Sequence, residues 1–483
     1  MGTINSALSL AAGALDADQA ALSVAANNVA NANTTGYTEE KPNWTENAPI
    51  EVDGVSTGDG VTETGATSQR NLVLEERLDQ QQQLASASST RLTALNNIQA
   101  LFTPDSGSSS STAGDIGSDI TKFFDSYSTL ESDPTDDADR EAVLSAASTL
   151  AGDVSGAASS LNSQSAALDQ EASGVVSQVN SLTSSIAQLN QQIEAISPDA
   201  DAGTLEDQRQ EDISQLSKLI GINQVKTENN GLSITTTSGQ LLVSEGQSDQ
   251  LTTGTVNGTT DFFLGGSDIT SQLATGGGQL GGYLTARDTD IPSALSSLDQ
   301  LAYNVSTKVN ALNNAGTDLD GNEGTGTNGD GVAGNGSTPL YIFNEPTQVA
   351  GSAAAMSVVM TDPNQIAAAG FGDGTGDNSN ATAMANLAGQ SIVSGQTPIN
   401  YYSNFVSTLG STVSEVQTEN TAQNASVTQL QTQNNSLSSV NLNDEAAAMS
   451  TLESSYQAAS QVFTLLNTIM ASALNLGEQT TVS

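Results

Sequence analysis

The chain has 483 residues, which is enough for two to four domains. Hydrophobic residues make up 36% of the sequence but aromatic residues only 4%, so we expect a core of aliphatic and small side chains, which suits long, closely packed helices. The formal net charge is -43, from 11 basic and 54 acidic residues, and no base follows Lys308. A phosphate-binding surface needs clustered Lys and Arg, so the charge excludes nucleic acid and anionic membranes as expected partners.

Two residue types that often form catalytic and metal sites are missing from the sequence. The sequence has no Cys and no His, which excludes disulfides and thiolate metal sites and removes the usual general base near neutral pH. We therefore expect a protein that is not an enzyme and has no catalytic, cofactor or metal site. The first forty residues contain no Lys or Arg, which argues against a cleaved secretory signal peptide. No apolar run reaches the roughly 20 residues that span a bilayer.

The N-terminus is predicted to be a helix with one apolar stripe. Apolar residues follow steps of four and three from Ile4 onward, and Leu8, Leu15, Leu22 and Val29 share one heptad position. The stripe stops at residues 31–36, where Asn, Thr and Gly end helices and form turns.

The next 160 residues predict a mostly helical region. Residues 52–67 are rich in Val, Thr and Gly and indicate a hairpin, and residues 103–118 form a Ser- and Gly-rich linker. Pro and acids at residues 133–137 are typical of the start of a helix near Arg140. An unbroken stripe over residues 161–196 predicts a helix about 50 Å long that ends before Pro198.

The second half of the chain alternates sheet, helix and loop. Residues 222–264 alternate apolar and polar side chains around turns at 229–231 and 238–239, which predicts a β-meander. Further stripes over 284–312 and 409–437 predict two more helices, and the Gly-, Asn- and Asp-rich residues 318–338 predict an exposed loop.

The C-terminus repeats the pattern of the N-terminus. Leu452, Tyr456, Phe463 and Leu466 lie on an uninterrupted stripe with the same spacing. Any one stripe fits an ordinary amphipathic helix on a globular core, but five of them favour an elongated bundle. We expect the two terminal stripes to pack against each other and against other copies of the chain.

Two short segments look like binding sites but do not hold the required pattern. A calcium loop that began at Asp318 would need Gly at its sixth position and Glu at its twelfth, where this chain has Glu323 and Gly329. Residues 276–282 are rich in Gly, but no strand-to-helix phosphate motif with a Lys surrounds them. A polar loop and a turn are the better interpretations.

The exits of the two terminal helices resemble signatures of flagellar rod, hook and hook-associated proteins. The N-terminal signature is residues 27–38 and the C-terminal one is residues 439–445; the residues that we assign to the turns are Asn27, Asn28, Asn31, Gly36, Tyr37, Asn441 and Leu442. Interior segments at residues 59–70, 133–140, 204–211, 278–288 and 376–380 resemble the hook-associated protein 1 family. One departure is Glu39-Glu40, where members of the family commonly carry Arg.

The resemblance implies a mainly α, elongated, multi-domain axial protein with inserted β structure. We expect a coiled-coil core of the two terminal helices, a helical-bundle middle domain and β-rich outer insertions. The division that we predict is an N-terminal axial helix (1–40), a helical middle domain with an N-terminal hairpin (41–220), a β-rich insertion (221–276), two further middle-domain helices (277–316 and 396–434), an intervening loop-rich or β insertion (317–395), and a C-terminal axial helix (435–483).

The resemblance also implies a role. It points to a structural subunit at the extracellular hook–filament junction, exported by the flagellar type III apparatus without a cleaved signal peptide. The implied partners are a homo-oligomeric ring, the hook protein, the second junction hook-associated protein and a flagellar export chaperone. Candidate packing and chaperone-contact residues are Leu8, Leu15, Leu22, Val29, Leu452, Tyr456, Phe463 and Leu466. A hook or distal-rod subunit, and a flagellum-exported adhesin, remain alternatives.

Overall fold

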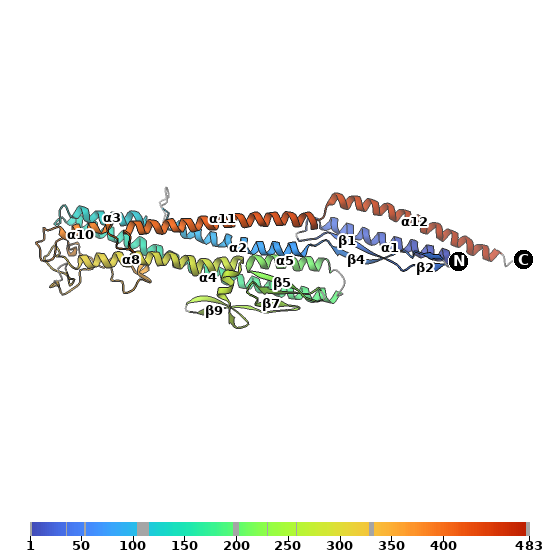
Figure 1. Ribbon diagram of the computed structural model, residues 1–483, viewed down its shortest axis with the longest axis horizontal. Helices are drawn as coiled ribbons and strands as arrows, with labels where there is room; N and C mark the ends of the chain where they lie inside the picture. The colour runs from blue at the N-terminus through green and yellow to red at the C-terminus, as the bar shows by residue number, and fades with distance from the viewer. Residues whose placement is uncertain are drawn as a thin grey trace.

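One very long helix, α4 (Asp137–Ile196), gives the molecule its length. Its 60 residues span about 90 Å at the rise of an α-helix. The computed structural model describes residues 2–34, 36–52, 55–103, 115–196, 202–228, 230–256, 258–327 and 333–479. The long helices of the middle of the chain run along the same axis as α4, whereas the first and last helices extend beyond its end (Figure 1). Both termini lie together at one end of the resulting rod.

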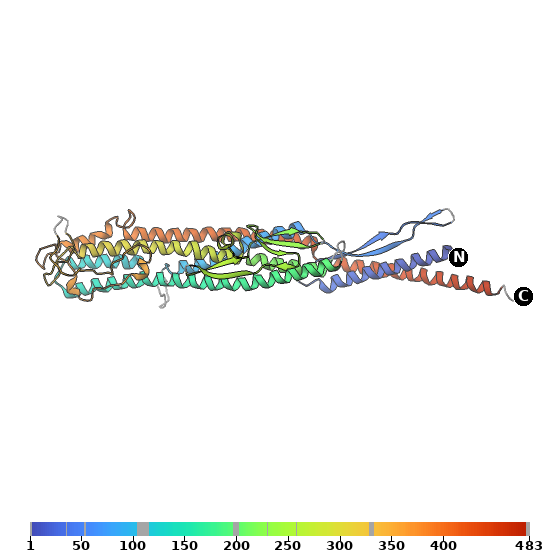
Figure 2. The ribbon, with the colours of Figure 1, turned by 90° about the horizontal axis from the view of Figure 1, so that it is seen from below.

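The end that carries the termini is built from two helices and a hairpin. Helix α1 (Gly2–Asn31) packs along α12 (Leu442–Gln479), and the ribbon of β1 (Glu40–Glu46) and β4 (Val61–Ser68) packs against α1. The ribbon continues into a shorter antiparallel pair, β2 (Ile50–Val52) with β3 (Val55–Thr57). We call α1, α12 and these four strands the axial unit. Figure 2 shows the ribbon projecting beside the helix pair.

The rest of the rod is a bundle of long helices. They are α2 (Leu72–Ala100), α3 (Ile116–Leu130), α4, α5 (Thr204–Leu219), α8 (Ile291–Asn313) and α11 (Pro398–Ser438). Residues 397–398 start α11 with a Thr cap whose hydroxyl accepts from Asn400 N and a Pro in the first turn, a favourable arrangement because that position needs no amide donor.

Two hydrophobic cores lie along α4. The first joins the first part of α4 to α2, α3, α8, the start of α11 and residues 340–393, and includes the aromatic cluster of Phe123, Phe124, Tyr127 and Phe343. The second joins Ala172 to Ala187 of α4 to α5, α7 and the sheets. Because α4 contributes to both cores, one helix holds the two halves of the bundle in a single rod.

The inserted β structure covers one side of α4. A four-stranded antiparallel sheet and a three-stranded one follow each other along the chain: β5 (Ile222–Lys226), β6 (Leu232–Thr236), β7 (Leu241–Ser244), β8 (Gln247–Ser248), β9 (Leu251–Val256), β10 (Thr259–Leu264) and β11 (Ser267–Asp268). The chain returns to the bundle through α6 (Thr270–Gly276), α7 (Gly278–Thr285) and a π-helical turn, η1 (Ala286–Asp290), that runs directly into α8.

The far end of the rod is formed by loops with short helices. These are α9 (Ser352–Ala355), η2 (Pro363–Gln365), α10 (Ser379–Asn386) and η3 (Leu387–Gly389). Arg140, at the start of α4, is fully buried there and donates to the carbonyl oxygens of Pro134 (2.6 and 2.9 Å) and Ile366 (2.7 Å). This guanidinium fastens the loops to the bundle, because a buried cation needs acceptors around it.

The predicted fold class is confirmed: the chain is mainly α, elongated, and carries inserted antiparallel sheets. Several predicted extents were wrong. The hairpin starts at Glu40 rather than at residue 52, and it packs on α1, whereas the sequence-based division grouped it with the middle domain. The helix predicted over 161–196 is the second part of the longer α4.

Two predicted loops differ in part from expectation. Asp318, at the start of the loop over 318–338, is buried rather than exposed. Most of the linker predicted at 103–118 (residues 104–114), and Asn229 in the predicted turn at 229–231, lie outside the described residues, whereas the turn at Gly239 is present with a φ of +87°. None of the helices in the described part of the chain has the length and apolarity needed to cross a membrane.

Candidate assembly interface

Small side chains make the closest contacts of the N-terminal helix. The fully buried apolar residues of α1 are Ala11, Ala17, Ala21 and Ala25. Since α1 contacts both α12 and the β1–β4 ribbon, these alanines let its two neighbours approach closely. In α12 the side-chain exposure is described as far as Leu474, and up to that residue only Glu445 is buried. Within one chain, therefore, the axial unit buries little apolar surface.

The predicted packing residues lie on this helix pair but none is fully buried. The half-buried ones are Leu8, Leu15, Leu22, Leu452, Phe463 and Leu466, and the exposed ones are Val29 and Tyr456, at 39% and 38% exposure. A spacing of seven residues drifts by about 20° per heptad on a straight α-helix. Val29 lies three heptads beyond Leu8, so it has turned away from the contact that Leu8 makes.

A second apolar stripe on α12 was missed by the sequence analysis. Val462, Leu465 and Ile469 repeat the spacing of three and four on another face of the helix, and Leu465 is 61% exposed. No charged residue occurs from Ser454 to Gly477. We call Val462, Leu465 and Ile469 the outer stripe. It is an uncharged, unpartnered surface on a chain whose net charge is -43.

The exit of α1 is organised by one asparagine. Asn28 is 1% exposed, and its Nδ2 donates to the carbonyl oxygen of Glu40 (2.8 Å) and to Oε1 of Glu445 (2.8 Å). Its Oδ1 accepts from the hydroxyl of Tyr37 (2.8 Å) and from the amide N–H of Glu40 (3.0 Å). All the hydrogen-bonding capacity of this carboxamide is used. It ties α1, the following turn and the first turn of α12 together.

The other N-terminal motif residues shape the turn around Asn28. Asn31, the last residue of α1, donates from Nδ2 to Oδ1 of Asn27 (2.8 Å). Gly36 has a φ of +80°, a conformation that glycine adopts without strain. Tyr37 points its hydroxyl at Asn28, and burial together with the nearby carboxylate of Glu40 raises its pKa.

The C-terminal motif begins α12. Oδ1 of Asn441 accepts from the amide of Asn443 (3.0 Å), and its carbonyl oxygen accepts from the amide of Glu445 (2.9 Å), so Asn441 occupies the cap position. Leu442, the first residue of the helix, is exposed. The two sequence motifs therefore meet in space at the hydrogen bond between Asn28 and Glu445. Burial raises the pKa of the Glu445 carboxyl, although the hydrogen bond from Asn28 acts in the opposite direction.

A polar joint connects the axial unit to the bundle. The amide of Thr38 donates to Oδ2 of Asp207 on α5 (3.1 Å), and Arg70, just before α2, pairs with Oδ1 of the same carboxylate. The amide of Glu39 donates to the carbonyl oxygen of Ser438, the last residue of α11 (2.8 Å). Sequence reasoning did not assign Arg70 or Asp207 a role, because they come together only in the fold.

Two buried carboxylates lie next to this joint, one helical turn apart on α2. Burial raises the pKa of Glu75 to about 7, against the opposing effect of Arg70. Burial also raises the pKa of Asp79 to about 7, although the side-chain amides of Gln210 and Gln224 both donate to its Oδ2 at 2.8 Å. Both carboxylates line a cleft of about 230 Å³ between α2, α5 and α11. In the sequence, the burial of these carboxylates is indicated only weakly, because the two acids are four residues apart and follow apolar residues.

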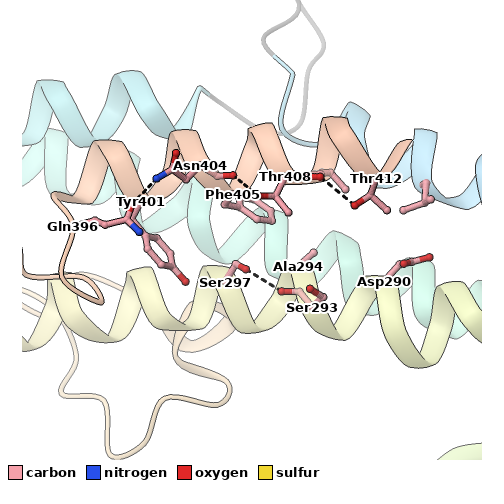
Figure 3. Close-up of a pocket in the computed structure, with 12 residues that line it drawn as sticks. Asp290, Ser293, Ala294, Ser297, Gln396, Tyr401, Asn404, Phe405, Thr408 and Thr412 are labelled. Carbon is pink, nitrogen blue, oxygen red and sulfur yellow. Dashed lines mark hydrogen bonds between the residues drawn. The ribbon is translucent and has the colours of Figure 1, made fainter. Parts of the chain in front are cut away.

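A groove of about 260 Å³ runs between α8 and α11 in the bundle (Figure 3). Tyr401 and Phe405 of α11 face Ser293 and Ser297 of α8 across it. Its carboxylate, Asp290, is paired through both oxygens with Arg91 at 2.8 Å. The lining therefore offers hydroxyl and amide groups without a set of free ionisable side chains.

The loop that resembles the start of a calcium site closes on itself. Both carboxylate oxygens of Asp318 accept from Asn322, one from its amide N–H (2.7 Å) and one from its side chain (3.1 Å). Across the described residues, acidic side chains do not gather in groups of three or more that could hold a metal ion.

The chain is similar to known flagellar proteins over nearly its whole length. The family described as "Flagellar hook-associated protein FlgK helical domain" matches residues 105–327, and the family described as "Flagella basal body rod protein" matches residues 8–38. The second match covers most of α1 and its exit turn.

Individual relatives agree with these matches. The chain is 25% identical to flagellar hook-associated protein 1 of Salmonella typhimurium, covering 98% of this chain and 100% of that protein. It is also 25% identical to flagellar hook-associated protein 1 of Bacillus subtilis, covering 96% of each. The flagellar hook junction protein FlgK from Burkholderia pseudomallei has a similar fold, with a TM-score of 0.62 at 19% identity over 74% of this chain and 99% of that one.

Proposed function

Since this chain belongs to the flagellar hook-associated protein 1 family, we propose that it is a structural subunit of the bacterial flagellum that joins the hook to the filament. The observation that carries this proposal is the axial unit. Its two terminal helices pair at one end of the rod, yet they leave an uncharged apolar stripe without a partner in the same chain. A surface of this kind suits assembly.

The subunit works by assembly rather than by catalysis. The family to which it belongs is structural. Two of the buried ionisable side chains tie elements together: Arg140 donates to loop carbonyl groups and Arg70 pairs with Asp207. We propose no substrate and no cofactor for the groove between α8 and α11.

We propose four partners in the flagellum. They are further copies of this chain in a ring, the hook protein, the second junction hook-associated protein and an export chaperone. The chain would reach this extracellular position through the flagellar type III apparatus. A chain with no Cys suits that route, because no disulfide opposes threading through a narrow channel.

Binding to purified hooks that lack filaments tests this function. The full chain is added to such hooks, and the bound fraction is measured by sedimentation and located by electron microscopy. We expect the chain to bind at the distal tip of the hook and to stop after a short, saturable layer. A chain that lacks residues 442–483 is expected not to bind, since it has lost α12.

The alternatives predict other outcomes. A hook or distal-rod subunit would lengthen the structure without saturation or bind only at the base. An adhesin would leave the hook tip bare and bind surfaces through the insertion at residues 222–276 or the one at residues 317–395. Either result would contradict the junction role.

A further inference from the structure

A cleft opens in the axial unit between its ribbon and its two helices. It has a volume of about 540 Å³, within the size range of concave binding sites. Ala21 and Ala25 of α1, Ala448 and Leu452 of α12, and Trp44 of β1 provide its apolar lining. Trp44 is the only tryptophan of the chain, and it is 46% exposed. A large aromatic side chain beside an open apolar cleft is the usual anchor of a protein contact.

The ribbon that carries Trp44 has little support of its own. It consists of two strands, with an irregularity between Pro42 and Trp44, and most of its side chains are exposed. A two-stranded ribbon alone is only marginally stable in water. Packing on α1 covers one side of it, so a further partner at the cleft would bury Trp44 and fix the ribbon.

Charge limits what that partner can be. Of the acids that line the cleft, Glu445 accepts a hydrogen bond from Asn28 and Glu39 lies 3.5 Å from Lys41, whereas Asp444 is exposed and adds negative charge to the rim. Another acidic surface would be repelled, and the chain as a whole carries -43. The outer stripe of α12 has the required character, because it is aliphatic and lies in the uncharged segment 454–477.

The positions of cleft and stripe determine the kind of contact. The cleft lies near Leu452 and the stripe is centred on Leu465, farther along the same helix. A contact between the cleft of one copy and the stripe of another joins two different surfaces. Such a head-to-tail contact repeats into a ring or a helix instead of closing as a pair.

We propose that the cleft between β1, α1 and α12 receives the outer stripe (Val462, Leu465 and Ile469) of a second copy of this chain, with Trp44 as the anchor. The proposal rests on the proposed function and names the contact through which the ring forms. At 1.5 Å per residue, the offset from Leu452 to Leu465 staggers neighbouring copies by about 20 Å along the axis.

Disulfide trapping between differently tagged chains tests the contact, because the natural chain has no Cys. Ala448→Cys in one chain and Leu465→Cys in the other are mixed, assembled on filamentless hooks and oxidised. We expect a product that carries both tags. The matched control is Thr464→Cys in place of Leu465→Cys, since Thr464 is exposed on another face of α12, and it is expected to give about tenfold less product.

The anchor is tested separately. Trp44→Ala is expected to raise the concentration needed for half-saturation of the hooks by about tenfold or more, and Trp44→Phe by much less. Trp44 lies outside both hydrophobic cores, so thermal unfolding of the bundle should not change in either variant.

The outcomes separate this contact from the function on which it rests. If the unmodified chain binds hooks but the 448–465 pair gives no more product than the 448–464 pair, or if Trp44→Ala binds as the natural chain does, the proposed contact is overturned and the junction role stands. If a benzophenone on Ala448→Cys links to the hook protein instead of a second copy, the contact is also overturned. If the unmodified chain does not bind hooks, both proposals fail.

Discussion

At the scale of single residues, the link between α1 and α12 depends on one buried asparagine whose hydrogen-bond partners are fully specified. Asn28 bonds to both main-chain groups of Glu40 and to the side chains of Tyr37 and Glu445. Its role explains why an amide is needed at this position: one end must donate and the other must accept. The N-terminal motif therefore joins α1 to the first turn of α12 through the hydrogen bond between Asn28 and Glu445.

The substitution Asn28→Asp tests whether this side chain holds α1 to α12, because Asp has the same shape as Asn but lacks its N–H donors. A carboxylate cannot donate to Glu445, and the two acids would face each other while buried, at a cost of about 2–4 kcal/mol. We expect faster amide hydrogen exchange in α1 and α12 of the full chain and loss of hook binding. Asn33→Asp, which adds the same charge at an exposed position, should behave as the natural chain. Unchanged exchange in the Asn28→Asp variant would refute the role of Asn28 in holding α1 to α12.

Glu75 and Asp79 show the opposite arrangement, in which burial acts against the charged form. Burial raises the pKa of each to about 7, above the ordinary values of 4.5 and 3.8. The folded chain therefore holds protons that the unfolded chain has already released. The stability that these groups contribute is present at low pH and is lost as the pH rises to about 7.

The variant Asp79→Asn mimics the protonated side chain at every pH. We expect it to unfold with a higher free energy than the natural chain, and this gain should grow by about 1–3 kcal/mol between pH 5 and pH 8. Denaturant unfolding followed by circular dichroism measures it. Glu141→Gln, at an exposed site on α4, is the control and should show no such trend. A gain in the free energy of unfolding that is constant from pH 5 to pH 8 would mean that burial does not raise the pKa of Asp79.

At the scale of elements, the sequence allowed prediction of the helices whose apolar residues are large and regularly spaced. The stripes over 161–196 and 409–437 lie in α4 and α11 as expected. The first part of α4 was predicted only at its start, since many of its buried residues, such as Ala147, Ala157 and Ala158, are small and give a weak periodic signal.

The ribbon and the joint were harder to predict. Strand β1 contains Pro42 and few apolar residues, so its position depends on α1, which covers it. The joint brings together Thr38, Asp207 and Ser438, which are distant in the chain and have no shared pattern. The turn motifs were recognised from the sequence, but their meeting at Asn28 and Glu445 was not.

Helix α12 carries a prediction at this scale. Phe463 is half-buried on the stripe that faces α1, so Phe463→Asp places a charge in the helix contact. We expect hook binding to fall by at least about tenfold, with the thermal unfolding of the bundle unchanged because neither core includes α12. Thr464→Asp adds the same charge on an exposed face and should bind much better. If the bundle also unfolds at lower temperature, Phe463 belongs to its core.

At the scale of the whole molecule, most of the arginines are buried, so acidic side chains dominate the surface. Six arginines occur in the chain, and four of them, Arg70, Arg140, Arg209 and Arg287, have buried side chains that bond to neighbouring elements. Few bases remain on the surface to offset 54 acids. In the ring that we propose, neighbouring copies would therefore meet through uncharged surfaces.

Assembly is accordingly expected to depend on salt and pH. The Debye screening length falls from about 30 Å at 0.01 M salt to about 10 Å at 0.1 M salt. We predict that hook binding strengthens as salt is raised over this range and as the pH is lowered toward the ordinary pKa of carboxylates. Binding that is the same under all these conditions would show that repulsion between copies does not matter.

A structural link between hook and filament is needed before the filament can form, so its role is tested by filament formation in cells from which this chain has been removed. We expect such cells to carry hooks without filaments and to release filament protein into the medium. Filaments should return on expression of the natural chain but not of Phe463→Asp or of the chain without residues 442–483. Normal filaments in cells that lack this chain would contradict the claim.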